Sequence, residues 1–192
     1  QDTECTDVVA IPGCTIEISC PPDVAIECDE STYPSNTGEA TAIASCDPNP
    51  TITYSDTSSG DACLTIITRT WTATDEFGNT DSCTQIITVV DSTPPVLTVP
   101  PDVTVGCGDP TGPAYTDWAI ATDNCGTPVV TYYDTEIEGC CAITIFRLWK
   151  ATDACGNSVS EVQTITRTDT TPPVITAPDD VTLEYGMSLP PA

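Results

Sequence analysis

The stretch Arg-Thr-Trp-Thr-Ala-Thr-Asp at residues 69–75 returns 78 residues later as Arg-Leu-Trp-Lys-Ala-Thr-Asp at residues 147–153. Successive side chains of a β-strand point to opposite faces of the sheet, so Arg69, Trp71 and Ala73 share one face. This tryptophan face is predicted to be the core. An arginine on it needs a carboxylate or an aromatic ring beside it, because an unpaired buried charge is costly. We expect a structural ion pair or ring stack in each copy.

The recurrence extends in both directions, so the chain is a tandem repeat. Residues 22–28 return as residues 101–107, and Asp-Ser-Thr-Pro-Pro at 91–95 returns as Asp-Thr-Thr-Pro-Pro at 169–173. A third copy starts but runs for one strand only. The predicted organisation is an N-terminal extension (1–14), a first repeat (15–91), a second repeat (92–169), and the first strand of a third repeat or a donor strand (170–192).

Within each repeat the pattern is all-β, because threonine, valine and isoleucine dominate and short runs alternate with glycine, proline and asparagine. We expect strands near residues 15–20, 23–28, 39–45, 51–55, 64–74 and 81–90, and again 78 or 79 residues later. Asp75 to Asn79 is typical of a tight hairpin in which the aspartate binds turn amides and Gly78 supplies a positive φ. The predicted fold class is all-β, with tandem immunoglobulin-like β-sandwich repeats stapled by disulfides.

The amino-acid composition argues against several classes of function. Twelve cysteines in 192 residues, with no histidine and no Cys-x-x-Cys pair, argue against metal–thiolate sites and for an oxidising compartment. We therefore expect an extracellular or cell-surface, secreted protein. A net charge of −25 argues against nucleic-acid and membrane partners, and no run is apolar enough for membrane insertion. Without histidine there is no Ser-His-Asp triad, so no enzyme is expected.

The motifs Ala-Thr-Asp-Asn-Cys-Gly (121–126), Arg-x-Trp-x-Ala-Thr-Asp-Ala-Cys-Gly-Asn (147–157) and Asp-Thr-Thr-Pro-Pro (169–173) resemble the hyalin-repeat-like family. The resemblance covers about residues 15–192. Its four-cysteine form is common in giant surface proteins of Bacteroidetes, including gliding adhesins, and it implies an adhesive or stalk module without catalytic residues. Phe77 and Glu161 stand where the pattern has cysteines.

An immunoglobulin-like sandwich brings several cysteines to common ends. We expect Cys125 to meet Cys155 at one end, and Cys28 to meet Cys63, and Cys107 to meet Cys141, at the other. Cys20 and Cys83 would link the first and last strands. The remaining cysteines, whose partners the sequence does not determine, are Cys5, Cys14, Cys46 and Cys140, with Cys46 expected to reach the N-terminal extension. The alternative to a purely structural staple is a cysteine that pairs between subunits.

Two further kinds of site are expected. Asp91 and Asp169, at the repeat junctions, could bind Ca²⁺ together with the hairpin carboxylates Asp75 and Asp153, because calcium prefers oxygen ligands. The alternative is that they only cap the ends of strands. For a Bacteroidetes source, the resemblance also implies O-glycosylation at Ser92, Thr170 and Ser82.

Residues 170–192 supply a strand that cannot bury its faces alone. Either the array continues, or this strand docks on a neighbouring copy through Val174, Val181 and Leu183 by β-strand addition. The predicted function is a structural segment of an extracellular stalk, adhesin or filament whose partners are copies of itself or adjacent repeats. The alternative is a module that binds a glycan or cell-surface ligand. Trp118, which has no counterpart in the first repeat, is either a surface contact or a variant core position.

Overall fold

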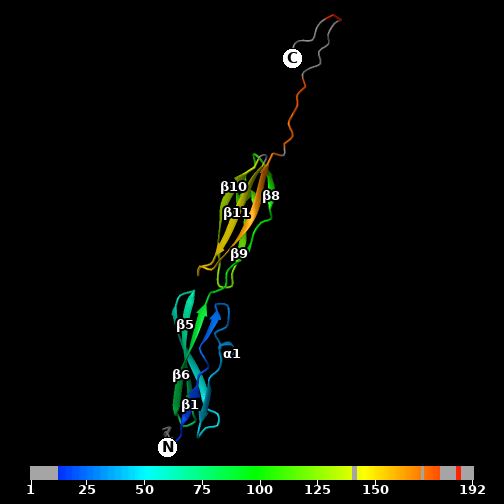
Figure 1. Ribbon diagram of the computed structural model, residues 1–192. Helices are drawn as coiled ribbons and strands as arrows, with labels where there is room; N and C mark the ends of the chain where they lie inside the picture. Colours follow the sequence, from blue (N-terminus) through cyan, green and yellow to red (C-terminus); the bar gives the residue numbers. More distant parts are fainter. Residues whose placement is uncertain (1–12, 140–141, 170, 178–184, 187–192) are drawn as a thin grey trace, which may run out of the picture.

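The computed structural model describes residues 13–139, 142–169, 171–177 and 185–186. Two β-sandwiches follow one another end to end along a rod, and the chain leaves the second sandwich at the end away from the first (Figure 1). Each sandwich consists of a four-stranded sheet and a two-stranded sheet. The all-β, immunoglobulin-like class expected from the sequence is confirmed.

The first sandwich has its four-stranded sheet in the order β2-β6-β5-β4, and β1 pairs with β3 in the second layer. Its elements are β1 (Ile16–Ser19), β2 (Val24–Glu27), α1 (Pro34–Thr37), β3 (Thr41–Ala44), β4 (Thr51–Gly60), β5 (Leu64–Thr74) and β6 (Thr80–Val90). The strand β2 runs parallel to β6, whereas β1 is antiparallel to β3. The chain therefore changes layers between β1 and β2, where Pro21 and Pro22 end the first strand.

The second sandwich repeats this arrangement with the order β10-β11-β12-β8 and the pair β7-β9. Its elements are β7 (Val96–Thr98), β8 (Val103–Gly106), α2 (Pro113–Thr116), β9 (Ile120–Thr122), β10 (Val129–Glu138), β11 (Ala142–Thr152) and β12 (Ser158–Thr168). The expected strands are present in both sandwiches, and β4 is longer than expected. The exact limits of the repeats stay a prediction.

Sequence reasoning missed the single-turn helices α1 and α2. A four-residue helix has no apolar period to reveal it, and its only signal is the proline at its start. Gly38 follows α1 with φ of 97°, and a Cβ there would lie 2.8 Å from the Pro21 side chain. The turn matters because it brings the Thr37 hydroxyl to the buried arginine of β5.

The core of the first sandwich is built around Arg69, whose side chain is only 1% exposed. Its guanidinium donates two hydrogen bonds of 2.8 Å to Asp56, one to the Thr37 hydroxyl and one to the Thr32 carbonyl. The Tyr54 ring lies 4.4 Å from the guanidinium carbon. The hydrogen bond with Asp56 is the main reason that the pKa of Arg69 is raised, although burial opposes it. The expected ion pair and ring stack are both present.

The second sandwich repeats the same network residue for residue. Arg147 is 1% exposed, pairs with Asp134 at 2.8 Å, and donates to the Thr116 hydroxyl and the Thr111 carbonyl. A buried glutamine completes each core: in the second sandwich it is Gln163, which accepts from the Trp149 indole. The tryptophan face predicted from the sequence is therefore the core, and its polar groups are paired.

Replacing Arg147 with methionine should lower the free energy of unfolding by about 3 kcal/mol, because the Asp134 carboxylate and two buried acceptors lose their donor. The exposed Lys150 on the same strand provides the control, and Lys150→Met should change stability by less than about 0.5 kcal/mol. Guanidinium denaturation of the oxidised protein, followed by tryptophan fluorescence, measures both. Equal, small effects would contradict a structural role for the buried pair.

Candidate functional site

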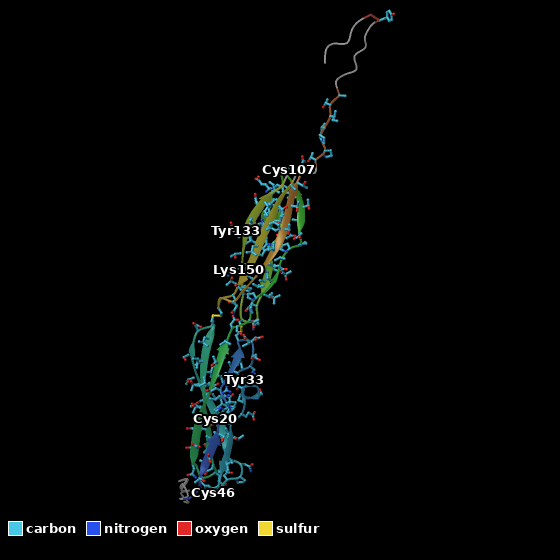
Figure 2. All side chains as sticks on the ribbon, viewed as in Figure 1. Cys20, Tyr33, Cys46, Cys107, Tyr133 and Lys150 are labelled. Atoms are coloured by element: carbon cyan, nitrogen blue, oxygen red, sulfur yellow. A yellow bond between two sulfur atoms is a disulfide. The ribbon has the colours of Figure 1, made fainter. Side chains whose placement is uncertain are left out.

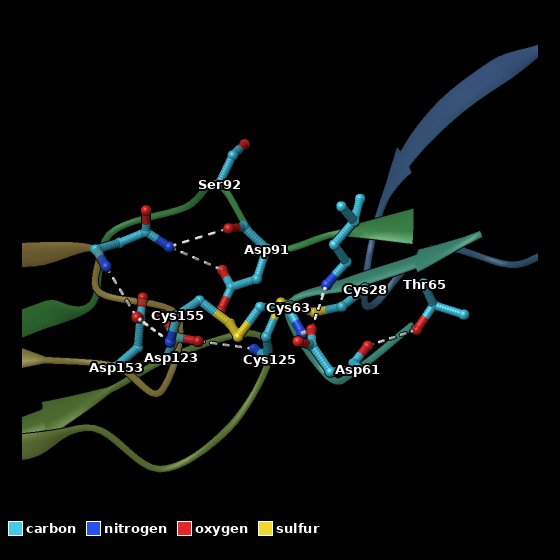
Figure 3. The surroundings of a disulfide bond; sticks show 12 residues. Cys28, Asp61, Cys63, Thr65, Asp91, Ser92, Asp123, Cys125, Asp153 and Cys155 are labelled. Atoms are coloured by element: carbon cyan, nitrogen blue, oxygen red, sulfur yellow. Dashed lines mark hydrogen bonds between the residues drawn. A yellow bond between two sulfur atoms is a disulfide. The ribbon is translucent and has the colours of Figure 1, made fainter. Parts of the chain in front are cut away.

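The main candidate site is the junction between the sandwiches, which two disulfides cross (Figure 3). Cys28, after β2, bonds to Cys125, after β9, with a Cα–Cα distance of 5.7 Å. Cys63, before β5, bonds to Cys155, in the turn between β11 and β12, with a Cα–Cα distance of 5.3 Å. Both distances suit a disulfide. The two sandwiches are therefore covalently joined at two points besides the peptide chain.

These bonds correct two expected pairings. Cys28 does not pair with Cys63, and Cys125 does not pair with Cys155. The members of each expected pair do lie at one end of their sandwich, as predicted. The error was to treat each sandwich alone, because the end that carries one pair faces the end that carries the other. All four cysteines therefore bond across the junction.

The other described cysteines have different roles. Cys20 and Cys83 form the bond expected between the first and last strands, and Cys46 bonds to Cys14 at the edge of the N-terminal extension, where it was expected to reach. Cys107 is exposed and has no partner among the described residues. Its expected partner Cys141 lies outside the described residues, as do Cys5 and Cys140.

Most of the junction cysteines donate a backbone hydrogen bond to the side chain of an aspartate two residues earlier in the chain. Asp123 accepts a 2.8 Å hydrogen bond from the amide of Cys125, and Asp153 does the same for Cys155. Asp61 accepts from the amide of Cys63 at 2.9 Å. Such Asp-x-Cys turns fix the backbone beside the sulfur atom. The cysteines are therefore presented by rigid turns and not by loose loops.

The hairpin turn predicted at Asp75 is confirmed in both sandwiches. Asp75 Oδ1 accepts from the amides of Phe77 and Asn79, and Gly78 has φ of 80°. Phe77 occupies the position that Cys155 has in the second sandwich, so this turn carries no disulfide. It lies at the end of the first sandwich that faces away from the junction (Figure 1).

Four carboxylates surround the junction disulfides, namely those of Glu27, Asp91, Asp123 and Asp153. Asp91 is 8% exposed and accepts from the Asn157 amide at 3.3 Å. Asp123 Oδ1 and Asp153 Oδ2 are buried and have no hydrogen-bond partner among the described residues. Negative charge is therefore concentrated at the junction, where two carboxylate oxygens have no hydrogen-bond partner among the described residues.

The crowding of carboxylates perturbs the pKa values of two of them. Desolvation, followed by repulsion from Asp153 and Asp123, raises the pKa of Asp91. Desolvation also acts on Asp153, but hydrogen bonds from Asn157 and the turn amides outweigh it, so the pKa of Asp153 is lowered. The hydrogen bonds of the turn therefore favour the charged form of Asp153, whereas burial and the neighbouring carboxylates disfavour the charged form of Asp91.

The structure brings together two of the four predicted calcium ligands. Asp91 and Asp153 meet at the junction, whereas Asp75 stays in its own turn and Asp169 is exposed at the other end of the second sandwich. Sequence reasoning missed Asp123 and Glu27. The Asp-x-Cys spacing repeated at residues 123–125 and 153–155 was the available signal for Asp123.

The sites expected from the resemblance alone stay predictions. Ser82 and Ser92 are exposed, and the Ser92 hydroxyl donates a hydrogen bond to Glu27 at the junction. Thr170 lies outside the described residues. Nothing in the structure tests O-glycosylation.

Comparison with known proteins shows that the chain is similar in sequence to hyalin. Hyalin from Lytechinus variegatus is 34% identical over 165 residues, which is 77% of this chain and 30% of hyalin. The chain thus spans less than a third of that relative. No family model matches the chain. The similarity supports the hyalin-repeat-like character indicated by the motifs, whereas the Bacteroidetes source stays a prediction.

Solved structures show weaker likenesses. The match to human mucin-like protocadherin EC1-2 covers 81% of this chain and 98% of the protocadherin chain, with 9% identity and a TM-score of 0.35. The match to the protocadherin gamma-B4 extracellular domain covers 81% of this chain and 33% of the protocadherin chain, with 13% identity and a TM-score of 0.31.

The pKa of Asp91 is open to direct test. Because it is raised in the folded state, this carboxyl stabilises the fold most below its ordinary pKa, and that contribution is lost as the pH rises through the raised value. Asp153→Asn should lower the pKa of Asp91 in a carboxyl ¹³C titration by NMR. Asp109→Asn, at the other end of the second sandwich, should leave it unchanged. An Asp91 pKa at or below the ordinary value would contradict the carboxylate cluster.

Proposed function

We propose that the chain is a segment of an extracellular stalk or filament, in which the disulfide-locked junction holds successive sandwiches in line. The observation that carries this proposal is the pair of bonds Cys28–Cys125 and Cys63–Cys155. A peptide linker alone lets neighbouring modules hinge. Two covalent links at separate points, added to the linker, oppose bending and twisting of one sandwich against the other.

The linker itself supports this function. Pro94 and Pro95 stiffen the connection between β6 and β7, and Pro95 is buried. At the start of the linker, the Ser92 amide and hydroxyl both donate hydrogen bonds to Glu27 of the first sandwich. The strand exit is therefore tied back to the sandwich that it leaves. Such an arrangement suits a rod that transmits force.

The other properties of the chain agree with an extracellular role. Four disulfides among the described residues require an oxidising environment. Within the described residues, no helix is long and apolar enough to cross a membrane. The partners that we propose are adjacent repeats or further copies of the same chain, together with other cell-surface components.

Removing both junction disulfides should release the orientation of the sandwiches while leaving each one folded. In the variant Cys28→Ser/Cys63→Ser/Cys125→Ser/Cys155→Ser, residual dipolar couplings should require a separate alignment tensor for each sandwich, whereas one tensor should fit the wild type. Cys20→Ser/Cys83→Ser is the control, because that bond lies within the first sandwich. It should lower stability by about 2–4 kcal/mol and keep a single tensor. A single tensor for the fourfold variant would argue against the proposal.

We also propose that a Ca²⁺ ion stiffens the junction. Calcium prefers hard oxygen ligands, and the junction offers carboxylate oxygens. They belong to Asp91, which is 8% exposed, and to Asp123 and Asp153, whose Oδ1 and Oδ2 atoms respectively have no hydrogen-bond partner among the described residues. Glu27 lies beside them. Cys125 and Cys155 are bonded to other cysteines and supply no ligand. A bound divalent cation would offset the carboxylate repulsion that, together with the larger effect of desolvation, raises the pKa of Asp91.

Calcium binding can be measured by isothermal titration of the chelated protein. Asp91→Asn should weaken binding at least tenfold, because it removes the central charge of the cluster, whereas Asp169→Asn, the exposed equivalent in the second repeat, should have no effect. The melting temperature of the wild type should rise with calcium, because a ligand that binds the folded state stabilises it. Equal affinities for the two variants, or no heat with the wild type, would reject this site.

Addition of the C-terminal strand to a neighbouring copy stays a second mode of assembly. Val174 is 92% exposed, which is compatible with docking elsewhere, while Val181 and Leu183 lie outside the described residues. However, Val174 corresponds to Val96 of β7, and in both described sandwiches the place beside β3 or β9 is taken by the sandwich's own first strand. A donor strand that took the place of β1 or β7 would have to displace it, which favours a continuing array.

The alternative function, a module that binds glycans, has one observation in its favour. Trp118 is 58% exposed and packs against two other aromatic rings. Its ring centroid lies 6.1 Å from that of Tyr132 and 6.0 Å from that of Trp149, and the centroids of Tyr132 and Trp149 are 5.2 Å apart. An exposed ring of this kind can stack on a sugar. The first sandwich has Glu39 at the equivalent position, so such a site would belong to the second sandwich only.

A further inference from the structure

The end of the second sandwich that faces away from the junction, here called the free end, is built like the end of the first sandwich that enters the junction. Cys28 follows Glu27, which is opposite Val90 in the parallel pair β2–β6. Cys107 follows Gly106, which is opposite Thr168 in the parallel pair β8–β12. The two cysteines therefore occupy the same structural position. Cys28 is bonded to the next sandwich, whereas Cys107 is exposed and has no partner among the described residues (Figure 2).

The loops around the two cysteines also match. At the junction, the Glu27 amide donates to Glu30, and the Asp61 amide donates to the Leu64 carbonyl. At the free end the Gly106 amide donates to Asp109 in the same way, and the Gly139 amide donates to the Ala142 carbonyl. The described loops of the free end thus repeat two hydrogen bonds of the loops on which the second sandwich sits at the junction.

This surface is hollowed. A cavity of about 270 Å³ is lined by Cys107, Arg167 and Asp169, together with Gly139, Ala142, Ile143 and Thr168. The residue that corresponds to Asp169 in the first sandwich is Asp91, which the following sandwich buries to 8% exposure at the junction. Asp169 is exposed. The free end therefore leaves exposed the equivalent of an aspartate that the junction buries.

We infer that the free end is a covalent docking surface for a further sandwich of the same repeat, joined through a disulfide between Cys107 and the cysteine equivalent to Cys125. The inference deepens, and rests on, the proposed stalk function. The occupant is indicated by the chain itself: it leaves the second sandwich at this end, and Val174-Ile175-Thr176 repeat Val96-Leu97-Thr98 of β7 (Figure 1). A sandwich that starts with such a strand would be placed as the second sandwich is on the first.

Charge complementarity supports the same occupant. The Asp-x-Cys turns bring Asp123 and Asp153 to the junction with their cysteines. A further sandwich with the same turns would bring two carboxylates to the free end, where Arg167 replaces Val89 and Gly106 replaces Glu27. Arg167 is partly buried, lines the cavity, and donates a hydrogen bond of 3.5 Å to the Thr111 hydroxyl. Its positive charge therefore lies at the surface on which those carboxylates would sit.

The bond forms by thiol–disulfide exchange with a disulfide oxidant, either a small-molecule disulfide or a disulfide oxidoreductase. One thiolate attacks the oxidant and releases one of its sulfurs as a thiol, leaving a mixed disulfide. The second thiolate then displaces the remaining half. Two protons and two electrons leave the pair of cysteines, one new S–S bond forms, and the oxidant is reduced to two thiols.

The test is the 192-residue chain with residues 92–169 duplicated in tandem, compared with the unaltered chain. Both are folded in a glutathione redox buffer, alkylated, and mapped as peptides without reduction. In the duplicated monomer, Cys107 of the first copy should be joined to Cys125 of the second, alongside Cys28–Cys125. In the unaltered chain, Cys107 should be alkylated. Cys107→Ser in the first copy is the matched control, which should remove the new link and keep Cys28–Cys125.

Two outcomes overturn the inference. The first is a duplicated chain that contains Cys28–Cys125 but leaves Cys107 of its first copy alkylated. The second is a Cys107 bonded to Cys140 or Cys141 in either chain. Absence of Cys28–Cys125 from the unaltered chain would overturn the proposed stalk instead, and with it the basis of this inference, so the two failures are distinguishable.

Discussion

The covalent attachment of one sandwich to the next is the constraint on which the rest of the molecule depends. Disulfides in small secreted domains usually close loops within a single core, as Cys20–Cys83 does here. Cys28–Cys125 and Cys63–Cys155 instead join two cores, so they restrict the relative motion of whole modules. The cores must then be stiff enough for that restriction to matter. Otherwise the ends could yield while the bonds stayed intact.

The arginine networks supply that stiffness. Arg69 and Arg147 each join a central strand of their sandwich, β5 or β11, to a neighbouring strand and to a one-turn helix and its preceding loop through four hydrogen bonds. Hydrogen bonds of fixed geometry specify one arrangement more narrowly than apolar contacts do, which is valuable where few large apolar side chains are available. The two-layer core is thin, so its paired polar groups fix the arrangement of the strands that a larger hydrophobic core would otherwise fix.

The sequence was sufficient for the features that repeat and are local. Alternation around Trp71 located the core face, and Asp75 with Gly78 located the hairpin turn, because both depend on neighbours in the chain. The partners of Cys28 and Cys63 depend on how two sandwiches meet, which no local pattern records. Placing Cys125 beside Cys155 was right, yet two cysteines at one end can bond to each other or to a facing pair. The place of Glu27 at the junction was missed for the same reason, whereas Asp123 was missed although the repeated Asp-x-Cys spacing is a local signal for it.

Charge explains why consecutive junctions need not be identical. A chain with a net charge of −25 resists bringing carboxylates together, yet each Asp-x-Cys turn carries one carboxylate with its cysteine. At the described junction Glu27 and Asp91 add to that charge, which the proposed Ca²⁺ ion would balance. At the free end Gly106 removes one acid, and Arg167 supplies a fixed cation. A stalk with both kinds of junction would soften at some joints when calcium is withdrawn and keep others rigid, so its flexibility would depend on position along the chain.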